Sequence, residues 1–180
     1  MLAGDYKNLR FEGEDNDETT LFFLRAHPLT NLGWVTLVLI FLAVPIVFQA
    51  LLTDNFIAIN LSARNIFLAV TTWYLVVAGF SFQRFLSWYF NIYILTNKRI
   101  VDIDFYGLFY RSVSQASLSN VEDITYTKGG LFQNFFDYGN ITLQTAGTAP
   151  NFEFTSIPDP EGNQQKIIDL VTRYKKGQLK

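Results

Sequence analysis

The sequence of 180 residues contains no cysteine and a single histidine. Without cysteine the chain can form no disulfide, no zinc–thiolate or iron–sulfur site, and no thiolate nucleophile. The one histidine, His27, stands beside a proline, and its neighbours in the sequence offer neither a nucleophile nor a partner carboxylate. We therefore interpret His27 as a structural residue. We expect no catalytic residue, no metal site and no cofactor, so the chain is not predicted to be an enzyme.

Charge is absent from one long apolar stretch and almost absent from a second. Residues 32–52 contain no charged side chain, and residues 66–86 contain only Arg84. A helix of this length spans about 30 Å, which is the thickness of a hydrocarbon core. We predict a transmembrane hairpin over residues 32–86. The alternative, a buried helix pair in a soluble protein, needs a larger core than a chain of this size provides. Pro45 is compatible with a membrane helix.

Basic residues are distributed unevenly around these two stretches. The loop between them has only Arg64, whereas Arg25 precedes the first stretch and Lys98 and Arg99 follow the second. The positive-inside rule therefore places the loop outside and both termini in the cytoplasm. Three residues at the end of the second stretch are predicted interfacial anchors: Arg84, Trp88 and Tyr89.

The N-terminal region differs in composition from the rest of the chain. Residues 1–20 are acidic and poor in apolar side chains, so we predict a disordered tail there. Residues 21–31 are predicted to be a juxtamembrane segment. Its apolar beginning either lies along the membrane interface or pairs with the domain that follows. We assign residues 87–176 to that domain and residues 177–180 to a C-terminal tail.

After the second stretch the apolar pattern changes to a period of two residues. Residues 100–105 place Val101, Ile103 and Phe105 on one face and two aspartates on the other, which is typical of a half-buried strand. We expect those aspartates, Asp102 and Asp104, to lie on a solvated face and not to bind a metal. Further strands are predicted near residues 89–95, 109–114, 121–126, 140–145 and 152–156. A helix is predicted after the cap residue Asp159, and short turns favour antiparallel pairing.

Several short motifs occur in order along the chain, at residues 24–28, 93–100, 118–124, 136–141, 144–147 and 157–161. The second reads YILTNKRI and is similar to the Y-x-L-T-N-x-R-I opening of the bacterial pleckstrin-homology-like domain family. The others resemble that family's downstream segments, although the G-x-G-x-I motif keeps only its second glycine, Gly139. The chain thus resembles the members with two transmembrane helices. The resemblance implies an α+β fold, in which a transmembrane hairpin precedes a PH-like antiparallel β-barrel or sandwich capped by a C-terminal helix. It also implies the cytoplasmic membrane of a bacterium, but no activity.

Two groups of side chains are candidate binding residues. Lys98 and Arg99 lie in the first strand–strand turn of the domain, where they are candidates for contact with an anionic lipid headgroup. The alternative is that these cations only orient the protein. Phe132, Phe135 and Phe136 are predicted to be core residues of a small barrel. If they are exposed, membrane dipping or a partner groove becomes the better interpretation.

These observations favour a non-enzymatic interaction or assembly module held at the cytoplasmic face of a membrane. The expected partners are the lipid bilayer and either a second copy of the chain or another membrane protein. No nucleic acid and no small-molecule substrate is expected. Anionic-lipid sensing through Lys98 and Arg99 is the alternative function. A membrane enzyme ranks third, because the apolar stretches hold no cluster of polar residues.

Overall fold

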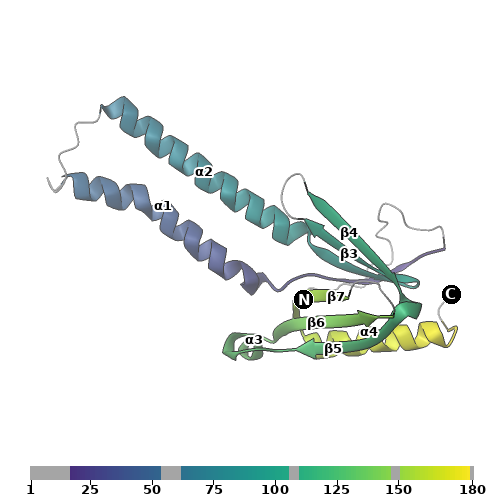
Figure 1. Cartoon of the computed structure of the whole chain (residues 1–180). Helices are drawn as coiled ribbons and strands as arrows, with labels where there is room; N and C mark the ends of the chain where they lie inside the picture. Colours follow the sequence, from purple (N-terminus) through teal and green to yellow (C-terminus); the bar gives the residue numbers. More distant parts are fainter. Residues whose placement is uncertain (1–16, 54–61, 106–109, 147–150, 179–180) are drawn as a thin grey trace. The chain divides into compact units, whose positions relative to one another are not determined.

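The computed structural model describes residues 17–53, 62–105, 110–146 and 151–178 (Figure 1). The chain divides into two compact units. Residues 28–88 form a helical unit, and the residues before and after them together form a second unit, the β domain. Most of the predicted acidic tail lies outside the described residues.

The helical unit contains the two predicted apolar helices. After a short 3-10 helix, η1 (Pro28–Asn31), helix α1 spans Leu32–Thr53 and helix α2 spans Ala63–Phe90. Both are long and apolar enough to cross a membrane, and their apolar side chains are almost all exposed. A buried pair of core helices is therefore not what this chain forms. The strand predicted from Tyr89 begins later, because α2 continues to Phe90.

The two helices contact each other at the position of a proline. Pro45 has no N–H to donate, so the carbonyl of Phe41, four residues earlier, lacks its usual helical partner. The indole N–H of Trp73 on α2 donates to that carbonyl at 2.9 Å, and the two rings pack edge to face. A side chain of α2 thus satisfies the backbone acceptor that the proline leaves open in α1.

The first sheet of the β domain contains four antiparallel strands in the order β1-β2-β3-β4. They are β1 (Thr20–Leu24), β2 (Ile92–Thr96), β3 (Arg99–Phe105) and β4 (Arg111–Ser117). Strand β1 pairs with β2, with Leu24 opposite Tyr93. The segment predicted to be juxtamembrane therefore contributes a strand to the domain. Of the two alternatives, lying along the membrane interface or pairing with the domain, the structure shows the second. The domain includes this strand as well as the residues after the hairpin, and the helical unit is inserted between two neighbouring strands.

The second sheet has the order β5-β6-β7 and is also antiparallel. Its strands are β5 (Val121–Thr127), β6 (Tyr138–Thr145) and β7 (Phe152–Pro158), and a 3-10 turn, η2 (Leu118–Asn120), leads into it. The short helix α3 (Leu131–Phe135) connects β5 to β6, and α4 (Pro160–Lys175) packs on both strands (Figure 1). The predicted cap is confirmed, since the Asp159 carboxylate accepts from the Gly162 N–H at 3.0 Å. The α+β class predicted from the sequence, with antiparallel strands and a C-terminal helix, is confirmed.

Strand β3 is covered on both faces. Ile100 belongs to the main core between the sheets, with Tyr93, Leu95 and Phe154, whereas Val101 and Ile103 form a second apolar cluster on the opposite face. The expectation of a solvated aspartate face on β3 is therefore wrong for Asp102. This residue shares the Tyr93 side of the sheet and is partly buried.

Candidate functional site

The turn between β2 and β3 is built around the hydroxyl of Thr96. This oxygen accepts from the backbone N–H groups of Lys98 (3.2 Å) and Arg99 (3.0 Å), and its own proton goes to Glu18 at 2.7 Å. Thr96 is fully buried. A hydroxyl side chain suits this position because it can both accept from the turn and donate to the segment before β1.

Glu18 lies beneath this turn with its side chain fully buried. Its carboxylate accepts from Arg99 Nε at 2.9 Å and from Arg99 Nη2 at 2.6 Å, which is a bidentate ion pair. The Arg99 side chain is 23% exposed, and its Nη1 donates to Gln115 on β4. Arg99 therefore joins the segment before β1 to strands β3 and β4.

Asn97 adds a second connection to the same segment. Its Oδ1 accepts from the Thr19 N–H at 2.9 Å, and its own N–H donates to the Thr19 carbonyl at 3.1 Å. Beside it, Lys98 Nζ pairs with Asp17 at 2.5 Å in a solvent-exposed position, and this hydrogen bond lowers the pKa of the Asp17 carboxyl. Residues 17–20, predicted to belong to a disordered tail, are thus held in place by the turn.

Both predicted headgroup-binding cations are therefore already paired with carboxylates. Lys98 and Arg99 border a hollow of ≈ 350 Å³ together with Gln115, Ser117 and Tyr174. An anionic ligand in this hollow would have to compete with Asp17 and with the buried Glu18 for the same cations. The role of Lys98 and Arg99 in lipid contact stays a prediction. The structure shows a second role, because their ion pairs with Asp17 and Glu18 hold the segment that leads into β1.

Asp102 is the clearest electrostatic irregularity among the described residues of the domain. Burial raises the pKa of its carboxyl to about 7, and the negative charge of Asp104 contributes to the same rise. One of its oxygens, Oδ1, is buried without a hydrogen-bond donor. On the neighbouring strand, the Tyr93 hydroxyl accepts from the Thr155 N–H at 3.2 Å, and burial also raises the pKa of Tyr93.

Helix α3 exposes the aromatic residues that were predicted to fill the core. Phe132, Phe135 and Phe136 are 71%, 82% and 41% exposed, and Leu131 is 88% exposed. The core prediction is therefore wrong for this segment. The sheets are already filled by strand residues such as Phe154 and Ile141, so the domain has no interior position for α3 side chains.

The remaining sequence candidates lie near the two connections between the units. The His27 ring stacks on Tyr138 with centroids 5.3 Å apart, and burial lowers the pKa of the imidazole. The Arg84 guanidinium lies 5.3 Å from the Phe80 ring, Trp88 packs near Phe85, and Arg25 lies over the Tyr89 ring at 4.6 Å. The role of Arg84, Trp88 and Tyr89 as interfacial anchors stays a prediction.

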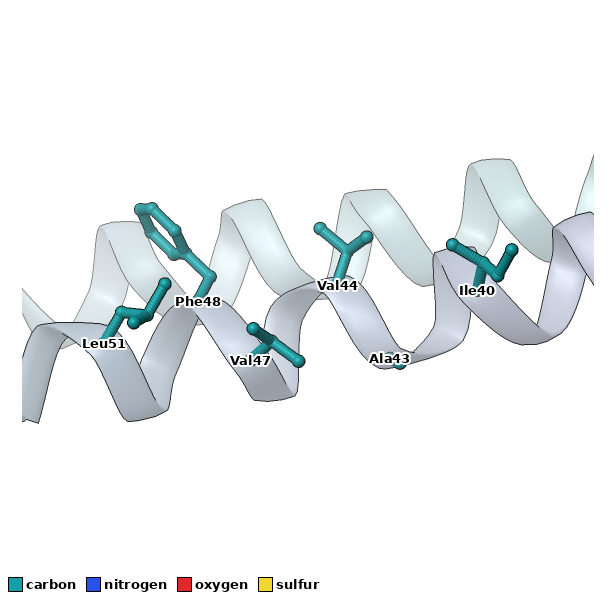
Figure 2. Close-up of a pocket in the computed structure, with 6 residues that line it drawn as sticks. All are labelled: Ile40, Ala43, Val44, Val47, Phe48 and Leu51. Atoms are coloured by element: carbon teal, nitrogen blue, oxygen red, sulfur yellow. The ribbon is translucent and has the colours of Figure 1, made fainter.

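The helical unit has an apolar hollow of ≈ 400 Å³ along one face of α1 (Figure 2). Its lining residues recur every three or four positions: Ile40, Ala43, Val44, Val47, Phe48 and Leu51. This spacing gives one continuous stripe on the helix. The stripe has no polar group that would orient a reactive ligand, so it suits hydrocarbon or another apolar helix.

The described residues provide no set of three or more histidine and acidic side chains that would hold a metal ion. The polar interactions around Thr96, Asn97 and Arg99 join strands of the β domain to each other and to the segment before β1. These interactions stabilise the fold of the domain.

The sequence profile described as Bacterial PH domain matches residues 27–171, which is more than half of the chain. The chain belongs to the bacterial PH domain family. The matched range includes both apolar helices and most of the β domain, but it begins after β1. In this bacterial PH domain chain, the strand before the helices and the carboxylates that precede it lie outside the matched range.

Two solved structures are similar to part of the bacterial PH domain chain. One is a DUF1696 family protein with a pleckstrin-homology domain from Shewanella loihica PV-4, and the other is a pleckstrin homology domain from Shewanella amazonensis SB2B. The identities are 19% and 17%, and the TM-score is 0.37 for each. The similarity covers 45% of this chain in both cases, and 70% and 66% of the respective solved chains. No curated protein matches the sequence.

Proposed function

We propose that this bacterial PH domain chain is a membrane-anchored interaction module whose β domain lies at the cytoplasmic face. The observation that carries the proposal is the insertion of α1 and α2 between β1 and β2, two strands that pair with each other. A domain connected at two neighbouring strands to a pair of membrane helices is held close to the bilayer. Such a connection raises its effective concentration toward membrane partners.

Three features support the membrane assignment of α1 and α2. Their apolar side chains are exposed along nearly their full length, which is costly in water. The backbone carbonyl opened by Pro45 is satisfied by Trp73 of the other helix, as lipid surroundings require. The basic residues Arg25, Lys98 and Arg99 flank the helices on the side of the β domain, which favours a cytoplasmic location for that domain.

Strand β4 is the surface we assign to a protein partner. Among the described residues β4 pairs with β3 alone, so its outer edge is open to a further strand. Its side chains alternate between exposed and half-buried from Arg111 to Gln115, and Val113 is exposed. An extended segment of a second copy or of another membrane protein would add to this edge through main-chain hydrogen bonds.

Crosslinking from this edge tests the interaction function. Val113 is replaced by photoreactive p-benzoylphenylalanine in the full chain, expressed in its native membrane, and Asp169 on α4 carries the same replacement as a matched control. We expect an adduct from Val113 and none from Asp169. A self-adduct identifies assembly, and a heterologous adduct identifies the partner. Equal labelling at both positions, or none at either, would remove β4 as the interaction edge.

Anionic-lipid sensing is the second candidate, because Lys98 and Arg99 border the polar hollow described above. The full chain in neutral detergent micelles is titrated with short-chain phosphatidylglycerol or phosphatidylcholine while its unfolding temperature is measured. A headgroup site would give a saturable, salt-sensitive rise with the anionic lipid alone, lost in Lys98→Gln. The interaction-module proposal predicts equal effects of the two lipids, because Asp17 and Glu18 already neutralise the cations.

A further inference from the structure

The three most exposed large apolar side chains of the described β domain, Leu131, Phe132 and Phe135, all belong to α3. Leu131, Phe132, Phe135 and Phe136 form the α3 apolar patch, and three of them are more than 70% exposed. Single exposed apolar residues are ordinary on protein surfaces, whereas a contiguous group of four large ones marks a contact surface.

The loop that carries this patch is held in shape by its own polar groups. Gln133 Oε1 accepts from the Gly129 N–H, and Asn134 Nδ2 donates to the Gly130 carbonyl at 2.8 Å. The two ends of the loop are joined by an ion pair between Lys128 and Asp137 at 2.6 Å. Because the polar side chains of α3 turn back into the loop, the apolar ones are left projecting outward.

The patch lies at the end of the β domain where the chain leaves for α1. The His27 ring stacks on Tyr138, which lies three residues after α3. The backbone N–H of His27 donates to the Ser156 carbonyl at 2.7 Å. Only the four residues of η1, Pro28–Asn31, separate His27 from the first apolar helix. His27, the last residue of the β domain before η1, is therefore packed against the strand that follows the α3 loop.

Other exposed aromatic side chains occur where the chain enters β2 and β4. Phe90 precedes β2 and packs on Phe105 at the end of β3, with centroids 5.3 Å apart. Nine large apolar side chains are exposed on the described part of the domain. Four form the α3 apolar patch, and three more are aromatic residues that precede β2 or β4: Tyr89, Phe90 and Tyr110. The other two are Val113 and Ile168. Exposed aromatic rings are typical of a membrane–water interface.

We propose that the α3 apolar patch inserts into the bilayer interface, so that the β domain contacts the membrane through this patch. This inference rests on the proposed membrane anchoring. A patch of four side chains is a weak membrane ligand by itself, but the covalent connection through η1 already holds it at the surface. The lipid bilayer is the occupant that fits best, because Tyr138, which follows the α3 loop, packs on His27, and the four residues of η1 connect His27 to the proposed membrane helix.

Spin labelling of the full chain tests this insertion, and the absence of cysteine means that each introduced thiol is unique. Three variants are labelled and reconstituted in vesicles of phosphatidylcholine and phosphatidylglycerol. Phe135→Cys reports on the patch, Ser119→Cys reports on the opposite end of β5, and Ile46→Cys reports on the middle of α1. Collisions of each label with oxygen, which concentrates in lipid, are compared with collisions with a water-soluble nickel chelate. Unfolding temperatures verify that the labelled variants fold alike.

For each label we compare the ratio of oxygen collisions to chelate collisions. We expect this ratio at position 135 to be several-fold higher than at position 119 and lower than at position 46. Equal values at 135 and 119, with position 46 in lipid, would overturn the insertion while leaving the anchor intact. Frequent collisions of the label at position 46 with the nickel chelate would show that α1 is in water and would overturn the membrane anchor itself. Spin–spin broadening at 135 that disappears on dilution with unlabelled chain would show self-association through the patch and also overturn the proposal.

Discussion

The buried carboxylate of Glu18 and the guanidinium of Arg99 form a bidentate ion pair across a sequence separation of 81 residues. Glu18 precedes the inserted helices and Arg99 follows them. The pair therefore closes the β domain around the insertion, and it explains why an arginine follows the Thr96-Asn97 turn. The arginine that seemed suited to a lipid headgroup has a structural partner inside its own domain.

Replacing Glu18 by glutamine should destabilise the β domain strongly. Glu18→Gln leaves the Arg99 charge without its counter-charge, and breaking one side of a buried pair costs about 3–5 kcal/mol. The free energy of unfolding is measured by denaturant titration of the full chain in detergent micelles. The control Asp17→Asn removes an exposed carboxylate that pairs with Lys98, so its unfolding should be nearly unchanged. Equal losses in both variants would contradict the special role of Glu18.

Gly139 is required for the close approach of β6 to β5. A Cβ added here would clash with the Thr127 carbonyl oxygen and would lie 3.2 Å from Pro160 Cγ. Gly139→Ala should therefore lower the free energy of unfolding by about 1–3 kcal/mol. At Gly129 the nearest atom to an added Cβ is Gln133 Oε1 at 3.7 Å, so Gly129→Ala is the matched control. The prediction fails if the two alanine variants unfold at the same denaturant concentration.

Asp102 should make the stability of the β domain depend on pH. Its pKa is about 7 in the folded chain against 3.8 for an ordinary aspartate, because burial disfavours the charged form. From about pH 4 to pH 7 the unfolded chain loses this proton while the folded chain keeps it. Stability therefore falls as pH rises through that range and stays level above it. Allowing for partial solvent screening, the loss is on the order of 1–3 kcal/mol.

The variant Asp102→Asn should flatten this pH dependence and should be more stable than the parent chain at pH 8. Unfolding is followed between pH 4 and pH 8 under otherwise constant conditions. Asp169→Asn serves as the control because Asp169 is an exposed partner of Arg173 on α4. An unchanged slope in Asp102→Asn would assign the pH dependence to another group.

Trp73 should stabilise the helix pair through the Phe41 carbonyl. Trp73→Phe keeps an aromatic ring but removes the N–H donor, and such contacts in membranes contribute about 0.6–1.7 kcal/mol. Unfolding of the helices by increasing dodecyl sulfate measures the loss. In a Pro45→Ala background the residue 45 N–H can satisfy the same carbonyl, so Trp73→Phe should cost less there. An equal cost in both backgrounds would show that the indole N–H does not compensate for the proline.

Some features of the chain followed directly from local sequence patterns. The period-two alternation identified residues 140–145 as part of a strand, and the Asp159-Pro160 pair marked the beginning of α4. The glycine retained from the family motif, Gly139, proved to lie where β5 leaves no space for a side chain. The strand and helix predictions depend on neighbouring residues alone, and a local pattern contains that information, whereas Gly139 was noted only through the family motif.

Other features required contacts between distant residues. The predicted solvated face of β3 was wrong for Asp102, because Ile100 on the same face belongs to the main core, and the alternation indicated only the apolar face of Val101 and Ile103. The predicted burial of Phe132 and Phe135 was wrong because other strands already fill the core. An aromatic residue has the same sequence signal whether it enters a core or projects from it.

The sequence by itself determined the two charge-poor helices, the alternating strands and the capped C-terminal helix, because periodicity and capping act over a few residues. Only the tertiary structure decided that β1 joins the domain across the inserted helices, that Glu18 neutralises Arg99, and that α3 faces outward. Strand pairing between Leu24 and Tyr93 depends on register and burial over the whole domain. The free energy of such long-range contacts cannot be predicted from the pattern of any short segment.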